Sequence, residues 1–186
     1  MLGESRLNIY VLAPDLSSRQ RERIQAQIAT GLRSLPQWVF ALLQQRIETL
    51  GSTNLPLIIE PQSSAVPFQV LSLGRVESRP AVKLTPRLSP EGVDWGQDLR
   101  RLLAKAIAWI LAPEDIDSPF WRRWKTAVEA DQLRDKAADS IGGPHDDTDL
   151  GLLIEMFAAH ALNPKHQNWD GLPRVRSFLE DWRSGS

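Results

Sequence analysis

The feature that most constrains the fold is an apolar helical pattern that begins at Leu99 and stops before Pro113. Its apolar side chains recur at steps of three and four residues, the spacing of one helix face: Leu99, Leu102, Leu103, Ala106, Ile107 and Ile110. Pro113 disfavours helical geometry in the residue before it, which sets the C-terminal limit of the helix. Because so continuous an apolar face must be covered, we expect Leu99–Leu111 to be the central helix.

Shorter apolar runs predict the elements around this helix. Before it, the sequence predicts a strand at 7–12, helices at 18–35 and 39–50, and strands at 57–59, 68–71 and 81–84. After it, the sequence predicts helices at 120–133, 147–162 and 172–182. Prolines at positions 56, 61, 67, 80 and 86 favour a small sheet that is rich in edges. The expected fold class is therefore α+β, with a small mixed sheet of proline-rich edges packed by about six helices.

The chain of 186 residues has the size of one ordinary domain, and it carries no long linker. We expect a single domain over residues 1–186. Within it, residues 1–51 hold a strand and two helices, residues 52–90 hold the small sheet, and residues 91–184 form a helical half.

Composition excludes several classes of function. The 22 basic and 23 acidic side chains leave a net charge of -1, which gives no field for a polyanion, so we expect no nucleic-acid partner. The absence of cysteine excludes disulfides, thiolate zinc ligands and a cysteine nucleophile. The longest uncharged run, 61–74, is too short to cross a bilayer, and no targeting segment is recognisable. We therefore expect a soluble, cytoplasmic protein without membrane insertion.

Two short segments of the C-terminal half carry a resemblance to a known family. The window Lys105-Ala106-Ile107-Ala108-Trp109 lies in the central helix, and Glu155-Met156-Phe157-Ala158 lies in the helix predicted at 147–162. With the apolar spacing over residues 36–182, these segments resemble the zincin metallopeptidases related to anthrax lethal factor. In that family the helix carries HExxH, with two histidine zinc ligands and a glutamate base, and a later ExFA segment supplies a third ligand.

The resemblance implies a degenerate zincin. Glu155 stands at the position of the third ligand, whereas Lys105 and Trp109 replace the two histidines and Ala106 replaces the base. Neither an ammonium group nor an indole can substitute for an imidazole on zinc, so we expect no catalytic residue, no metal and no cofactor. An ion pair between Lys105 and Glu155 would replace the lost cation. Changing Lys105 and Trp109 to His and Ala106 to Glu would rebuild the motif.

A second group of potential metal ligands lies near the start of the helix predicted at 147–162: His145, Asp146, Asp147 and Asp149. Its spacing fits no standard zinc or calcium loop, and the preceding Gly142-Gly143-Pro144 indicates a turn. These side chains are therefore expected to cap the helix or to form the turn. His160 and His166 lack a second ligand four residues away, and we expect each to be a surface or capping residue.

Seven tryptophans, at 38, 95, 109, 121, 124, 169 and 182, are the remaining signal. Trp121, Trp124 and Trp169 are the candidates for contact with a partner, because an exposed indole marks an interaction surface. The basic and aromatic run at 120–125 could stack bases. However, helical spacing places Phe120 and Trp124 on one face, so core packing explains the run.

These observations favour a non-catalytic, zincin-like module without bound metal that binds or scaffolds a protein or peptide partner. One alternative is a hydrolase that uses a divalent metal and the acidic and histidine side chains between 145 and 166: Asp146, Asp147, Asp149 and Glu155 among them. A structural subunit of a larger assembly is another alternative.

Overall fold

The structure is a computed structural model that describes residues 7–11, 16–49, 55–60, 71–76, 79–89, 92–95, 98–140 and 148–185. In the N-terminal half the elements follow in the order β1 (Leu7–Val11), α1 (Ser18–Arg33), α2 (Gln37–Thr49), β2 (Leu55–Ile59), β3 (Leu71–Val76), β4 (Arg79–Leu84), β5 (Arg87–Ser89) and β6 (Gly92–Asp94). The C-terminal half continues with α3 (Leu99–Leu111), α4 (Pro119–Ala130), α5 (Leu133–Ser140), α6 (Asp149–Leu162), the 3-10 helix η1 (Gln167–Gly171) and α7 (Pro173–Ser184).

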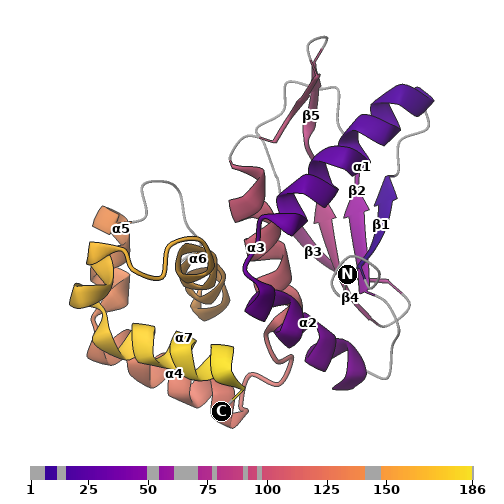
Figure 1. The fold of residues 1–186 in the computed structure, drawn as a ribbon. Helices are drawn as coiled ribbons and strands as arrows, with labels where there is room; N and C mark the ends of the chain where they lie inside the picture. Colours follow the sequence, from indigo (N-terminus) through magenta and orange to yellow (C-terminus); the bar gives the residue numbers. More distant parts are fainter. Residues whose placement is uncertain are drawn as a thin grey trace.

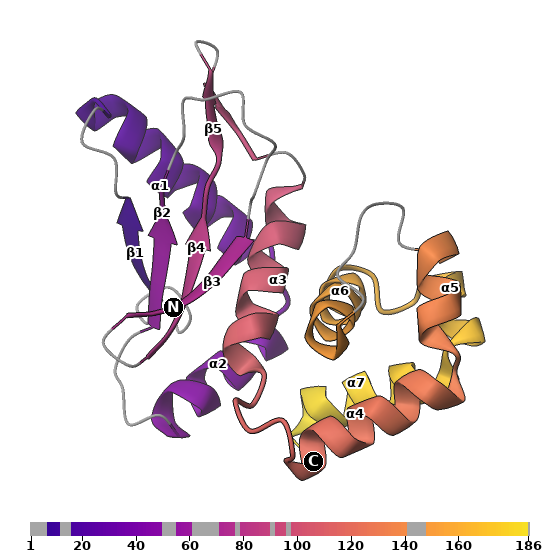
Figure 2. The same cartoon turned by 180° about the vertical axis from the view of Figure 1, so that it is seen from behind.

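The main sheet has four strands in the order β1-β2-β4-β3. The pairs β1–β2 and β2–β4 are parallel, and β3 runs antiparallel to β4. The helix α1 covers one face of this sheet, as the opposite views in Figure 1 and Figure 2 show. A small mixed sheet combined with many helices confirms the expected α+β class.

The prolines do not lie where the sequence predicted them. Pro56 is in β2 and Pro80 is in β4, the two inner strands of the sheet, so the expectation of proline-rich edges is wrong for them. The pairing register gives the reason. The β2–β4 ladder begins only at Leu57 and Val82, so each proline is in a strand segment with only one pairing neighbour. Proline, which lacks an N–H, is tolerated at such strand starts.

Helix α3 is the centre of the molecule, as predicted. It lies between the sheet with α1 and α2 on one side and the helices α4 to α7 on the other (Figure 1). Its buried side chains surround almost the whole helix: Leu102, Leu103, Ala104, Ala106, Ile107, Ala108, Ile110 and Leu111. Since burial of a leucine or isoleucine side chain contributes about 1.5–3 kcal/mol, packing alone can hold α3 in place.

Polar side chains fix where several helices begin. The hydroxyl of Ser17 accepts a hydrogen bond from the Gln20 backbone N–H and forms a capping box at the start of α1. Asp98 accepts backbone N–H groups at the start of α3, and Thr148 does so at the start of α6. The three helix starts are thus set by local sequence.

The observed elements differ from the predicted ones at several places. The helix predicted at 120–133 ends at Ala130, where Gln132 takes a left-handed conformation with φ 52° and a separate helix, α5, follows. The short hairpin of β5 and β6 was not predicted. Strand β3 extends to Val76, beyond the predicted end at 71, while residues 68–70 lie outside the described part of the chain.

Candidate functional site

The contact between α3 and α6 brings together two of the positions that the family resemblance singled out. Lys105 is on α3, and Glu155 is on α6 at the flank of the buried stripe. Arg101 precedes Lys105 by one helical turn, so both cations lie on the same side of α3. These three residues, Arg101, Lys105 and Glu155, are called the α3–α6 charge triad below.

The triad divides its two cations between the two oxygens of one carboxylate. The Lys105 Nζ atom pairs with Glu155 Oε1. The Arg101 Nη2 atom donates to Glu155 Oε2 over 3.0 Å. The Lys105 and Glu155 side chains are each 14% exposed, while Arg101 is 36% exposed. The predicted ion pair between Lys105 and Glu155 is therefore present, half-buried, and reinforced by a charge-assisted hydrogen bond from Arg101.

The other two singled-out positions lie on the same helix. Ala106 is buried at 2% exposure, and Trp109 is partly buried and packs against the hydrophobic core. Zinc needs three deprotonated or neutral donors. Lys105 and Trp109 offer none, and the Lys105 ammonium group already occupies one oxygen of Glu155. These residues therefore do not fit a zinc ion.

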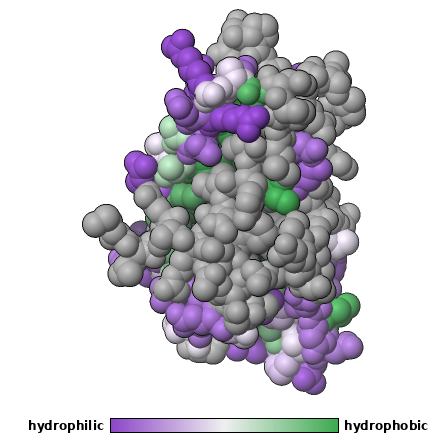
Figure 3. Space-filling model, turned by 90° about the vertical axis from the view of Figure 1, so that its right-hand side faces the viewer, coloured by the Kyte–Doolittle hydropathy of each residue, from purple (hydrophilic) through white to green (hydrophobic). Residues whose placement is uncertain are grey.

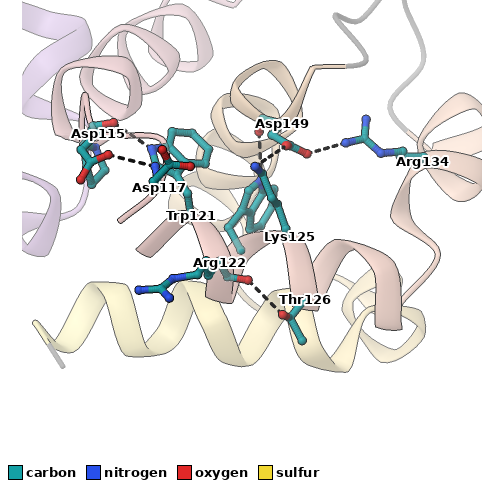
Figure 4. Close-up of polar contacts among 10 residues, drawn as sticks. Asp115, Asp117, Trp121, Arg122, Lys125, Thr126, Arg134 and Asp149 are labelled. Atoms are coloured by element: carbon teal, nitrogen blue, oxygen red, sulfur yellow. Dashed lines mark hydrogen bonds and ion pairs between the residues drawn. The ribbon is translucent and has the colours of Figure 1, made fainter. Parts of the chain in front are cut away.

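The acidic and histidine side chains between 145 and 166 are not brought together where the structure describes them. Asp149 lies at the start of α6, and Figure 4 shows Lys125 and Arg134 pointing toward it. Its carboxylate pairs with Arg134 and lies 3.9 Å from the Lys125 Nζ atom. Residues 145–147 lie outside the described part, and within that part no three potential ligands gather around one point.

The three tryptophans considered for partner contact are core residues, which corrects that expectation. Trp121, Trp124 and Trp169 have exposed fractions of 6%, 0% and 4%. Their indole N–H groups donate to the backbone carbonyls of Pro113, Asp149 and Asn163, respectively. Because the rings are buried and their polar atoms are satisfied inside the fold, they offer no surface to a partner.

The described surface is mostly polar. Figure 3 shows hydrophilic side chains predominating among the coloured residues of one face, with apolar ones in small separate areas. Among the residues whose burial the structure gives, Ile116 is the large hydrophobic residue that is exposed, at 62%. A broad aromatic docking surface is thus absent from this described part of the molecule.

His160 departs most from its sequence expectation. It lies in the last turn of α6, but its side chain is 1% exposed, whereas a surface or capping residue was expected. Neither ring nitrogen has a hydrogen-bond partner. The signal for burial was present, because His160 continues the helical spacing of Leu153 and Phe157. His166, by contrast, is exposed.

Comparison with known proteins identifies no relative. No protein-family pattern matches the chain, and neither a curated protein nor a solved structure matches it. Among the described helices, none is long and apolar enough to cross a membrane. Because these comparisons give no function, the proposal below is based on the residues of the α3–α6 contact.

Proposed function

We propose that this chain is a non-catalytic, zincin-like module that binds a protein or peptide partner. The observation that carries the proposal is the α3–α6 charge triad, in which two cations hold Glu155 where the family resemblance places a third zinc ligand.

The position of the triad supports the zincin-like frame. In a metal site of this kind, the first histidine of the helix and the later glutamate approach one ion, so their side chains must face each other. Lys105 and Glu155 face each other across the α3–α6 contact in that manner. Two helices with unrelated registers would bring these two positions together only by chance.

The chemistry of the triad supports a role without catalysis. Ala106 stands where a general base would be required, and an alanine cannot accept a proton. The carboxylate of Glu155 is neutralised by Lys105 and Arg101. A carboxylate that accepts charge-assisted hydrogen bonds in a half-buried contact stabilises the helix pair by about 1–3 kcal/mol. The ion pairs therefore perform structural work that a bound metal would otherwise perform.

Arg101 gives the triad a side suited to recognition. A guanidinium group carries five N–H donors, and Glu155 engages it through one terminal nitrogen. The remaining donors lie on a side chain that is 36% exposed. A carbonyl or carboxylate of a bound peptide is the acceptor that such a planar donor group recognises best.

The test uses a displayed library of random peptides selected on the purified full chain. We expect the selected peptides to bind the Arg101→Lys variant with an affinity at least tenfold lower than wild type. This change keeps a positive charge beside Glu155 but removes the planar donor group. The matched control is Arg122→Lys, at an exposed position of α4. Failure to select any peptide, or equal binding to both variants, would contradict the proposal.

A further inference from the structure

His160 is a titratable group enclosed among aromatic rings. Its ring centroid lies 6.1 Å from that of Trp38 on α2 and 5.4 Å from that of Trp169 on η1. With 1% exposure, the imidazole sits where α2, α6 and η1 meet. In the described part of the chain, its two nitrogens are the buried side-chain nitrogens without a hydrogen-bond partner.

This environment accommodates a neutral imidazole but not a charged one. A protonated histidine has two N–H donors, and each would be buried without an acceptor. Burial of an unpaired charge is far more costly than burial of a neutral polar group. Proton uptake at His160 is therefore coupled to movement of whatever covers the ring.

The charged groups that act on the ring come from α7. Burial lowers the pKa of His160 below its usual 6.5, Glu180 opposes that effect, and Arg183 and Arg176 add to it. Arg176 and Glu180 also form an ion pair of 2.9 Å with each other. The partners of the ring on α2 and η1 are the uncharged rings of Trp38 and Trp169.

The cover over His160 is a short C-terminal unit. The Trp169 N–H donates to the carbonyl of Asn163, which immediately follows α6. From α7, Arg183 lies over the Trp38 ring at 5.7 Å, and Trp182 contacts Phe157 with ring centroids 5.0 Å apart. Among the described residues, α7 also packs against α4, where Phe178 contacts Phe120 and Trp124. The helix α7 can thus keep its contact with α4 while it moves away from α6 and α2, and α3 can remain in the core.

We propose that His160 is a pH-sensitive latch: its protonation releases η1 and α7 from α6 and α2 without unfolding the central helix. The neutral ring closes the latch, and acidification opens it. Opening exposes the aromatic side chains that α7 covers at neutral pH, Trp38 and Phe157 among them.

Hydrogen exchange of the full chain at about pH 7.5 and pH 5.0 tests this latch. If the open state titrates with a pKa near 6.5 and the closed state does not bind the proton, the opening equilibrium rises by up to about 30-fold between these conditions. We expect the protection factors of η1 and α7 amides to fall by up to that factor relative to those of α3 amides. An equal fall in α3 would show global unfolding and overturn the proposal.

Two variants separate His160 from the other histidines. His160→Phe keeps an aromatic ring and removes the titration, so it should abolish the pH-dependent loss of protection in η1 and α7. His166→Gln, at an exposed site, should leave that loss unchanged. An unchanged response in His160→Phe, or a lost response in His166→Gln, would overturn the latch.

A direct NMR titration of the wild-type imidazole keeps the test decisive if His160→Phe does not fold. The latch requires an apparent pKa below 6.5 for His160. A pKa at or above 6.5 would show that the two tryptophan rings stabilise the charged form, as aromatic faces can, and would overturn the latch.

Discussion

Lys105 on α3 and Glu155 on α6 form an ion pair across the most extensive helix–helix contact of the described structure. Arg101 binds the second oxygen of the same carboxylate. The contact is half-buried, so its charges are less screened by solvent than those of a surface pair. Loss of the carboxylate would leave the Lys105 and Arg101 cations close together without their anion.

We therefore expect Glu155→Gln to lower the free energy of unfolding by about 1–3 kcal/mol, measured by urea denaturation. The double variant Lys105→Met with Glu155→Leu removes both charges of the ion pair. It should lower the free energy of unfolding by less than the sum of the two single changes, because neither single partner is then left buried without the other. The control is Glu180→Gln, which removes the exposed pair of Arg176 and Glu180. It should lower the free energy of unfolding by less than about 0.5 kcal/mol. Equal effects of the two pairs would contradict the structural role of the triad.

A buried carboxylate at Asp131 holds the start of α7. Its Oδ2 atom accepts the Val175 backbone N–H at 2.7 Å, although the two residues belong to different elements, and Asp131 is 4% exposed. Because Leu172 offers no side-chain cap to α7, Asp131 performs that task from a distance. Asp131→Ala should cost about 1–3 kcal/mol by urea denaturation. The exposed Asp135→Ala should stay within about 0.5 kcal/mol, and a similar cost at both sites would refute this role.

Gly31 allows α1 and α3 to approach closely. A Cβ atom at this position would lie 2.7 Å from Leu103 Cδ1 and 3.3 Å from Leu99 Cγ. Since Leu103 is fully buried, it has little room to move. We expect Gly31→Ala to destabilise the protein by about 1–3 kcal/mol, although alanine is the better helix former by about 1 kcal/mol. Thr30→Ala, exposed on the same helix, should not destabilise, and a thermal melt of both variants decides the point.

The pKa of His160 makes global stability depend on pH in a defined direction. Because burial lowers the folded-state pKa below 6.5, the unfolded chain binds the proton more readily. The stability that neutral His160 contributes is fully present above the pKa of the unfolded chain. As pH falls below about 6.5, the free energy of unfolding decreases, by up to about 1.4 kcal/mol at pH 5.5. Urea denaturation of wild type and His160→Phe, each at about pH 7.5 and pH 5.5, isolates the contribution of His160 to the free energy of unfolding. A wild type that gains stability relative to His160→Phe on acidification would have the wrong sign.

The sequence predicted the long helices because their apolar spacing is regular. It missed α5 because the segment from Leu133 to Ser140 carries little apolar pattern. The break before α5 lies at the left-handed Gln132, next to Asp131, whose carboxylate accepts a hydrogen bond from the Val175 N–H, and neither feature is a local signal. Strand order also depends on tertiary contacts. It places β2 and β4, which contain Pro56 and Pro80, at the inside of the sheet.

The candidate site was predicted in part. The family resemblance implied that Lys105 would meet Glu155, and the two side chains form an ion pair. Arg101 was missed, although its place one turn before Lys105 could have indicated it. The burial of Trp121 and Trp169 could not be read from the sequence, since an indole is equally suited to a core and to an interface.

The central claim, a zincin-like frame in which cations replace the metal, is tested most directly by rebuilding the motif. The variant that combines Lys105→His, Ala106→Glu and Trp109→His should bind one zinc ion per chain, measured by metal analysis after dialysis and by calorimetry. Adding Glu155→Gln to it should weaken zinc binding at least tenfold, because the third ligand is lost. A folded triple variant that binds no zinc, or that binds it equally well without Glu155, would contradict the account.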